Sequence, residues 1–364
     1  MIIAVVVAGT RPEVIKLAPV IIRAKEAYRQ QLSLKLCLTG QHASLAQDAL
    51  AIFKIRPDVN LHIMRENQAI NEVDSAVSKA LPPVLGRLKA DLVVVQGDTT
   101  TAAASALCAF HSGIPVAHVE AGLRSHNLRA PFPEEGNRRV IATVAVHHFC
   151  PTESARENLL RESVPERLIH VTGNTIVDAL EHIRRANALD NVGSVVQGLQ
   201  GAFVLLTAHR RESFGKGLRT ICEAIQTCAR KFPHLQFVYP VHLNPNVRVP
   251  VHSLLGGLKN VILIEPVSYL DLLTLLKNCE FVLTDSGGIQ EEAPTFGKYC
   301  IVLRDVTERI ESVNLGISEL VGTDVDKIVN AVSKAMDSTQ RKIPTVNPYG
   351  DGNASQRILD VLCK

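Results

Sequence analysis

The 364-residue sequence contains no tryptophan, and aromatic residues make up only 4% of it. Because 46% of the residues are nevertheless hydrophobic, the core must be built mainly from aliphatic side chains, as in layered α/β proteins. This composition excludes a disordered chain. At about 150 residues per domain, the length favours two domains over one.

Long apolar runs and basic clusters are also absent. The N-terminal run Ile2–Val7 is far shorter than the roughly 20 residues of a membrane span, and no basic segment precedes it as in a signal peptide. We interpret it as a buried strand. With 39 basic and 36 acidic residues spread along the chain, neither a nucleic acid nor a membrane is an expected partner, so any anion must be bound by a local pocket.

Cysteine pairs and metal motifs are missing as well. The eight cysteines form no C-x-x-C pair, and Cys37, Cys150 and Cys300 lie in or beside apolar runs, which favours buried, reduced thiols in a cytoplasmic protein. The sequence has no H-E-x-x-H or cysteine-rich pattern, so no metal is expected. The segment Gly215–Gly217 departs from a dinucleotide fingerprint, and no nicotinamide or other cofactor is expected either.

Short β-branched runs alternate with helix-period segments, which predicts an α/β protein with two doubly wound parallel sheets in tandem. The first domain is predicted at residues 1–172 and the second at 173–352, and a helix within 353–364 is expected to return to the first domain. Since such sheets bind ligands at the carboxyl ends of their strands, we expect one substrate in a central cleft that both domains face. The predicted strands are 2–7, 34–38, 92–95, 116–119, 148–150, 203–207, 236–239, 261–264, 281–284 and 300–303.

Two strand ends carry features suited to a nucleotide. The first strand runs into Gly9–Glu13, followed by Lys16, so free backbone N–H groups and cations are expected where a phosphate binds. A plain turn with proline at the helix start explains the segment equally well. After the strand at 281–284, Gly287 and Gly288 would let the backbone approach a ligand, and Glu292 would accept both hydroxyls of a ribose. The alternative is a capped helix with solvated acids.

Charged residues follow several other predicted strands. His209 and Arg309 belong to cationic segments of the second domain, at a density that suits a diphosphate. The first domain offers carboxylates instead, at Asp98, Glu120 and Glu134. Acids at the ends of apolar strands need partners or a function, because burying an unpaired charge is unfavourable. Structural ion pairs with Arg124, Arg138 or Arg139 are the alternative.

Seven segments, in the same order along the chain, resemble the family of non-hydrolysing UDP-N-acetylglucosamine 2-epimerases. The resemblance covers nearly the whole chain and implies the glycosyltransferase-B type of fold, in which two Rossmann-like domains face a cleft. It also implies a UDP-sugar substrate, a homodimer and a place in surface polysaccharide synthesis. The segments are Gly9–Glu13, Gly97–Thr100, His118–Arg124, Pro133–Glu135, His209–Glu212, His242–Pro245 and Asp285–Pro294.

The family resemblance also implies the chemistry and the residues that perform it. UDP leaves by anti elimination to give 2-acetamidoglucal and adds back after protonation on the opposite face, without nicotinamide. The diphosphate would contact Arg11, Lys16, His209 and Arg309, and the phosphate and ribose edge would contact Ser286 and Glu292. Asp98, Glu120 and Glu134 would face the sugar. These three carboxylates and His209 are the expected catalytic residues.

One segment departs from the family pattern. Bacterial members bind a second, activating UDP-sugar through Gln-His-Arg-x-Met, whereas residues 41–45 here read Gln-His-Ala-Ser-Leu. The cation of the motif is missing, so we expect weak or absent activation. The residues that remain as candidates for this allosteric site are Gln41, His42, Gln68, Arg210 and His242.

Three other functions share parts of this sequence pattern. A hydrolysing epimerase would release the free amino sugar and UDP. A glycosyltransferase would share the nucleotide half but gives no reason for three acids at the sugar end. A non-catalytic nucleotide-sugar-binding protein would bind UDP without turnover. We expect the non-hydrolysing epimerase, which inverts C2 of a UDP-N-acetylhexosamine.

Overall fold

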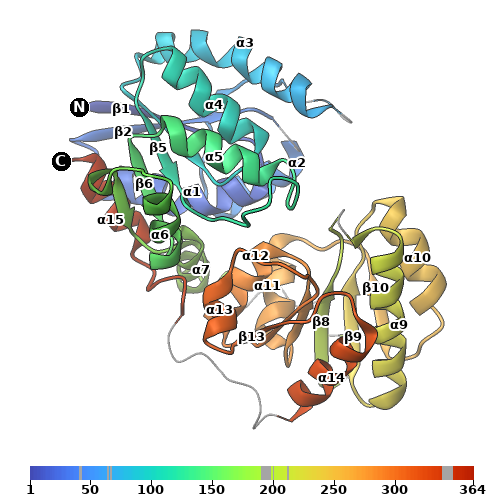
Figure 1. Ribbon diagram of the computed structural model, residues 1–364. Coiled ribbons are helices and arrows are strands. Elements are labelled where there is room, and N and C mark those ends of the chain that lie inside the picture. The colour runs from blue at the N-terminus through green and yellow to red at the C-terminus, as the bar shows by residue number, and fades with distance from the viewer. Residues whose placement is uncertain are drawn as a thin grey trace. The chain divides into compact units, whose positions relative to one another are not determined.

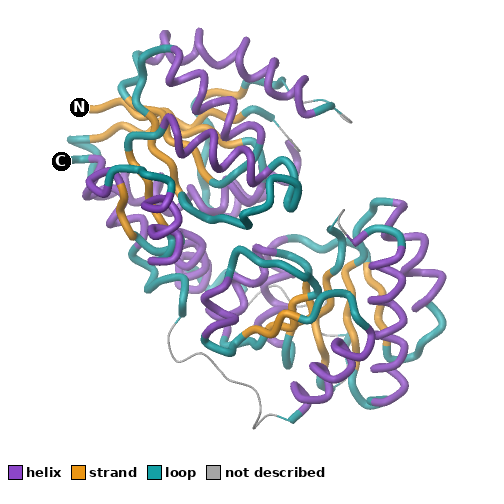
Figure 2. Tube along the Cα trace, in the orientation of Figure 1, coloured by secondary structure: helices purple, strands orange, loops and turns teal. Residues whose placement is uncertain are grey.

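The computed structural model describes residues 1–40, 43–63, 65, 68–189, 198–199, 201–210, 213–337 and 347–364. The chain forms two compact units, one of Met1–Ile183 with Tyr349–Lys364 and one of Arg184–Pro348. Each unit has a parallel β-sheet between helices (Figure 2). This confirms the predicted α/β fold with two doubly wound sheets. None of the helices described is both long and apolar enough to cross a membrane.

The first unit contains a seven-stranded sheet in the order β3-β2-β1-β4-β5-β6-β7. Its direction of winding reverses between β1 and β4, and open α/β sheets commonly bind ligands beside the carboxyl ends of strands at such a reversal. The strands are β1 (Ile2–Ala8), β2 (Leu32–Leu38), β3 (Val59–Asn60), β4 (Leu92–Gln96), β5 (Val116–Val119), β6 (His147–Cys150) and β7 (Ile169–Val171).

Helices cover both faces of this sheet (Figure 1). Helices α3, α4 and α5 pack aliphatic side chains against β1, β4 and β5, whereas α1 packs with α2 and α15. The helices of the unit are α1 (Arg11–Ala27), α2 (Ala43–Ile52), α3 (Ile70–Leu88), α4 (Thr100–His111), α5 (Glu134–Val144), α6 (Glu153–Arg161), the short η1 (Glu166–Leu168), α7 (Thr175–Arg185) and α15 (Ala354–Leu362).

The second unit repeats the pattern with a six-stranded sheet in the order β10-β9-β8-β11-β12-β13. Here the winding reverses between β8 and β11. The strands are β8 (Phe203–Thr207), β9 (Gln236–Pro240), β10 (Val261–Ile264), β11 (Val282–Thr284), β12 (Cys300–Val302) and β13 (Ser318–Leu320). The helices are α9 (Lys216–Lys231), α10 (Pro245–Leu255), α11 (Tyr269–Asn278), α12 (Gly287–Glu292), η3 (Ala293–Phe296), α13 (Ile310–Asn314) and α14 (Val325–Met336), of which α9, α10 and α14 share one apolar core with the sheet.

The division between the units differs from the predicted boundary at residue 172. Helix α7 stays with the first unit as far as Ile183, because Asp178 accepts hydrogen bonds from the backbone N–H groups of Ala354 (3.1 Å) and Ser355 (2.8 Å). The chain therefore returns at Tyr349 rather than at 353. Helix α15 packs on α1, where Arg23 donates to Gln356 at 2.6 Å.

Every predicted strand is present, with ends shifted by at most two residues, but β3, β7 and β13 were not predicted. These three contain only two or three residues each and lie at the sheet edges, so they leave no pattern in the sequence. Cys37, Cys150 and Cys300 are buried as predicted.

Candidate active site

The backbone N–H groups of the turn after β1 donate to the carboxylate of Glu13. Thr10 caps α1, and Glu13 Oε2 accepts the backbone N–H groups of Gly9 (2.9 Å) and Thr10 (2.7 Å). Glu13 Oε1 accepts the hydroxyl of Thr99 at 2.7 Å, which joins the turns after β1 and β4. Burial raises the pKa of Glu13. The expectation that these N–H groups are free for a phosphate is therefore wrong, because Glu13 already occupies them. Arg11 is the first residue of α1, directly beyond this turn.

Glu120 follows β5 in an unusual backbone conformation. Its φ angle of 65° lies in the left-handed region, which costs a residue with a side chain about 1–3 kcal/mol and persists only where the surrounding structure holds it. The side chain is nevertheless buried, with the residue only 7% exposed. Surrounding contacts must therefore hold this residue in place.

Three donors converge on one carboxylate oxygen of Glu120. Lys16 Nζ forms an ion pair with Oε2, and Gln96 Nε2 (3.1 Å) and Asn174 Nδ2 (3.5 Å) donate to the same atom. Lys16 was expected at a diphosphate and as a cation beside free N–H groups. In the structure Lys16 pairs with Glu120, because α1 brings the ammonium group to the end of β5; its contact with a diphosphate stays a prediction.

Asp98 ends the neighbouring strand and is held by α5. Arg138 donates to Asp98 Oδ2 from Nε (2.8 Å) and Nη2 (2.6 Å), and Asn137 Nδ2 donates to the Asp98 carbonyl at 2.8 Å. Behind Arg138 lies the fully buried Glu135, which accepts Arg138 Nη1 at 3.2 Å. Glu134, the first residue of this helix, is partly buried. The ion-pair alternative thus holds for Asp98 with Arg138.

Asp98 and Glu120 lie at the same edge of the sheet, as predicted. The register places Gln96 of β4 opposite Val119 of β5, so the two carboxylates follow adjacent strand ends. A hydrogen bond also joins the two strand ends, from His118 Nε2 of β5 to the Gly97 carbonyl at 2.7 Å. Of the other two suggested structural partners, Arg124 pairs with Glu162 at 2.7 Å and Arg139 with Glu135 at 3.4 Å.

In the second unit, Asp285 links the ends of β8 and β11. Its Oδ2 accepts the backbone N–H groups of His209 and Arg210, both at 2.7 Å. The ring of His209 stacks on that of His242, with centroids 5.5 Å apart and an angle of 13°. Burial, and then the neighbouring His209, lower the pKa of His242. Two candidate allosteric residues, Arg210 and His242, therefore lie beside a candidate catalytic one.

Arg309 is held by two buried carboxylates. Its Nε and Nη2 lie 2.8 Å from Glu291 Oε1, and its Nη1 lies 3.1 Å from Glu308 Oε2. A Cβ at Gly287 would lie 2.9 Å from Arg309 Cζ, whereas one at Gly288 would meet only Ser286 Oγ, at 3.8 Å. The absence of a side chain at Gly287 thus makes room for the guanidinium group of Arg309, and the approach of a ligand to the backbone of both glycines stays a prediction.

The other predicted nucleotide residues surround α12. Ser286 is its N-cap, and its backbone N–H donates to Thr284 Oγ1 at 2.9 Å. Glu292, the last residue of α12, is buried and accepts the hydroxyl of Tyr269 at 2.8 Å. It is thus not one of the solvated acids of the alternative interpretation.

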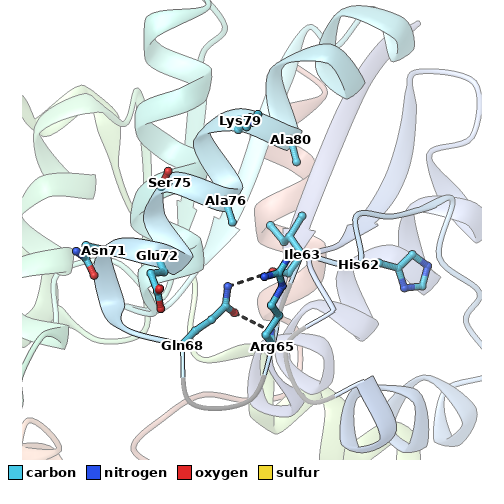
Figure 3. Close-up of a pocket in the computed structure, with 10 residues that line it drawn as sticks. All are labelled: His62, Ile63, Arg65, Gln68, Asn71, Glu72, Ser75, Ala76, Lys79 and Ala80. Carbon is cyan, nitrogen blue, oxygen red and sulfur yellow. Dashed lines mark hydrogen bonds between the residues drawn. The ribbon is translucent and has the colours of Figure 1, made fainter.

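The remaining allosteric candidates belong to the first unit. Gln41 and His42 lie outside the described residues. Gln68 lines a pocket of about 1000 Å³ before α3, where its Oε1 accepts the Arg65 N–H at 2.8 Å and its Nε2 donates to the Ile63 carbonyl at 3.3 Å. Figure 3 shows these residues beside α3, whose Glu72, Ala76 and Ala80 also line the pocket. Within the described residues, no group of His, Cys, Asp and Glu side chains could hold a metal ion.

Comparisons with known proteins match nearly the whole chain. The family model described as UDP-N-acetylglucosamine 2-epimerase matches residues 25–363. A protein of that name from Yersinia pestis is 46% identical over 370 residues, which cover 98% of this chain and 97% of its own. The chain belongs to the UDP-N-acetylglucosamine 2-epimerase family. It is therefore an enzyme of the epimerase type.

Solved structures of other epimerases are similar throughout. The UDP-GlcNAc 2-epimerase from Neisseria meningitidis, bound to UDP-GlcNAc, is 42% identical with a TM-score of 0.94, and the match covers 100% of this chain and 99% of that one. The enzyme from Methanocaldococcus jannaschii, in complex with UDP-GlcNAc and UDP, is 36% identical with a TM-score of 0.88 and the same coverage.

Several residues of this epimerase escaped the sequence analysis because their role depends on contacts between distant segments. Gln96 and Asn174 carry no charge, yet both bind Glu120. Tyr269 precedes its partner Glu292 by 23 residues. Asp285 did give a signal, since it directly follows a strand at the point where the winding of the sheet reverses.

Proposed function

We propose that the enzyme reversibly converts UDP-N-acetylglucosamine to UDP-N-acetylmannosamine, or a closely modified pair, by inverting C2. The substrates named for the similar solved structures support this choice. We further propose that the first unit supplies the acid–base groups for the sugar and that the second unit binds UDP. A homodimer in the cytoplasm is part of this proposal, and buried thiols such as Cys37 suit a reducing compartment.

The chemistry requires the C1–O bond to break before C2 can lose its hydrogen. No carbonyl group neighbours C2, so a carboxylate cannot remove that hydrogen from the intact sugar. As UDP leaves with the bonding electron pair, positive charge develops at C1 and makes the C2 hydrogen acidic. A carboxylate takes the proton, and the C–H electrons form the C1=C2 bond of 2-acetamidoglucal. Donors to the departing UDP stabilise its growing charge.

The return step runs in the opposite order with one change of face. A proton adds to C2 from the side opposite to that of the first abstraction, and a phosphate oxygen of UDP bonds to C1. UDP is thus released and consumed in equal amounts. Because the two proton transfers occur on opposite faces, two acid–base groups are needed. We propose that Asp98, Glu120 and Glu134 provide them.

The environment of Glu120 is the main support for the proposed acid–base chemistry. The Glu120 carboxylate is buried, and the backbone of this residue is in the left-handed conformation. Lys16, Gln96 and Asn174 all bind one carboxylate oxygen. These are more partners than a structural ion pair requires. The three donors fix the carboxylate as an acid–base group must be fixed. Asp98 lies at the adjacent strand end, held by Arg138.

On the nucleotide side, we propose that His209, Arg309, Ser286, Gly288 and Glu292 bind UDP. The guanidinium group of Arg309 is fixed by Glu291, Glu308 and the surface of Gly287, which lowers the entropy lost when it donates to phosphate. Arg11 would add a further donor from the first unit. Lys16 is assigned to Glu120, so its contribution to the diphosphate is indirect.

The test is to incubate the purified chain with UDP-GlcNAc and to follow ¹H and ³¹P spectra. We expect a UDP-ManNAc anomeric signal that grows to equilibrium while the total diphosphate-ester signal stays constant. Release of free N-acetylmannosamine with an equal amount of UDP would identify a hydrolysing enzyme instead. A changed UDP-GlcNAc spectrum without any product would identify a binding protein.

A further inference from the structure

Asp285 has one carboxylate oxygen that the backbone contacts do not explain. The residue is fully buried, and Oδ2 alone accepts both N–H groups at the start of the loop after β8. Oδ1 is equally buried, and no described residue forms a hydrogen bond to it. A buried acceptor without a partner is unfavourable by about 1–3 kcal/mol. An oxygen kept in this position needs another role.

The imidazole of His209 lies close to this oxygen. His209 Nδ1 lies 3.7 Å from Asp285 Oδ1, and the side chain of His209 is 41% exposed. One ring nitrogen thus faces the buried carboxylate, which leaves Nε2 for a ligand. The distance is long for a hydrogen bond, but such contacts commonly shorten when substrate is bound.

His242 fixes the ring of His209 from a second direction. The two imidazoles are stacked at 5.5 Å, and His242 Nδ1 accepts the backbone N–H of Asn244 at 3.1 Å. This hydrogen bond leaves Nδ1 of His242 without a proton. His242 therefore stays neutral, and its flat face supports the neighbouring ring without repelling a charge on it.

We propose that Asp285 is the positioning residue of His209, forming an Asp–His pair that keeps a proton on Nδ1 and presents Nε2–H to the departing UDP. The inference rests on the proposed function and adds to it the group that prepares His209. When Nδ1–H donates to the Asp285 carboxylate, the imidazole of His209 is protonated on both nitrogens and is positively charged. Nε2–H then donates to a phosphate oxygen as the C1–O bond breaks, and no proton needs to be exchanged with solvent.

A purely structural role for Asp285 predicts a different response to Asp285→Asn. The amide oxygen of asparagine can still accept the N–H groups of His209 and Arg210, so the link between the loops survives. The amide NH₂ group then faces His209 Nδ1 and can only donate to it. His209 is forced to carry its proton on Nε2 alone and cannot become the imidazolium ion. Only the positioning role is sensitive to this change.

The first experiment measures the protonation of His209 directly. In the full chain labelled with ¹⁵N-histidine, with His209→Gln used to assign the signals, we expect Nδ1 of His209 to be protonated in the wild type. In Asp285→Asn we expect Nδ1 to have the chemical shift of an unprotonated nitrogen. An unprotonated Nδ1 in the wild type overturns the proposal. Because this spectrum needs no turnover, it tests the Asp–His pair even if the proposed reaction fails.

The second experiment separates kcat from binding. We expect Asp285→Asn to lower kcat by about 10²-fold, the usual effect of losing one charge-stabilising donor, and to weaken UDP binding by a smaller factor, because the Nε2–H group of the neutral His209 can still donate to the diphosphate. Tyr239→Phe is the matched control, because it removes a hydroxyl bonded to the Ala208 carbonyl in the same loop but leaves Asp285 intact, and it should retain kcat. A kcat within twofold of the wild type in Asp285→Asn overturns the proposal. If Asp285→Asn does not fold, the wild-type spectrum decides.

Discussion

His118 makes the stability of the first unit depend on pH. It belongs to β5 and is fully buried, and its Nε2 donates to the Gly97 carbonyl. Its Nδ1 has no hydrogen-bond partner among the described residues. Charging the ring would bury an unpaired N–H group with its charge, and burial accordingly lowers the pKa of His118 to about 3.

The direction and size of the effect follow from linkage. Below about pH 6.5 the unfolded chain binds a proton at this position and the folded chain does not, so stability falls as pH falls towards 3. Between pH 8 and pH 5 the loss is about 2 kcal/mol for this residue. At pH 5 the folded ring is still neutral, so this figure depends only on the unfolded-state pKa. Burial lowers the pKa of the neighbouring His148 to about 4, which adds a similar loss.

The assay compares His118→Gln with the wild type at both pH values. Glutamine keeps the donor to Gly97 but does not titrate, so the loss of unfolding free energy between pH 8 and 5 should be about 2 kcal/mol smaller in the variant. Hydrogen exchange of peptides that contain β5, measured in urea, reports the first unit specifically. His111→Gln, at the exposed end of α4, is the control. An equal pH dependence in His118→Gln and the wild type would refute the reasoning.

Three further outcomes test the site. The variants Asp98→Asn, Glu120→Gln and Glu134→Gln should each lower kcat by about 10²-fold or more, while UDP affinity stays near wild type. Wild-type rates in all three variants would show that these acids have only structural roles. Gly287→Ala should weaken UDP binding by about 10- to 100-fold, as Arg309→Ala should, because the new Cβ displaces the guanidinium group. Calorimetry checks this, and Gly257→Ala, which meets no atom within 4 Å, should leave affinity unchanged. The reverse reaction from UDP-ManNAc alone should start without added UDP-GlcNAc, since residues 41–45 lack the motif's cation; a lag that a trace of UDP-GlcNAc abolishes would contradict this.

The sequence was sufficient to predict the sheets because their central strands are continuous aliphatic runs. Val93, Val94 and Val95, for example, are all buried, so their pattern reflects one dominant force. Strands such as β3 and β7 form only because a longer neighbour offers hydrogen bonds at an edge. No property of two or three residues could reveal that.

The candidate site was predictable as a set of positions but not as a set of partners. Parallel topology places Asp98 and Glu120 at one edge whatever their contacts are. The pairing of Lys16 with Glu120 joins residues 104 positions apart, and the packing of α1 rather than any local pattern decides it. Gly287 shows the same limit, since a glycine in the sequence indicates a close approach but not which group approaches.

We propose above all that C2 exchanges its hydrogen with acid–base groups of the protein during epimerisation. The most direct test is ¹H NMR and mass spectrometry of UDP-GlcNAc incubated with the enzyme in D₂O. We expect UDP-ManNAc, and the UDP-GlcNAc formed from it by reversal, to carry deuterium at C2. Epimerisation without deuterium at C2 would contradict elimination and the acid–base roles assigned to Asp98, Glu120 and Glu134.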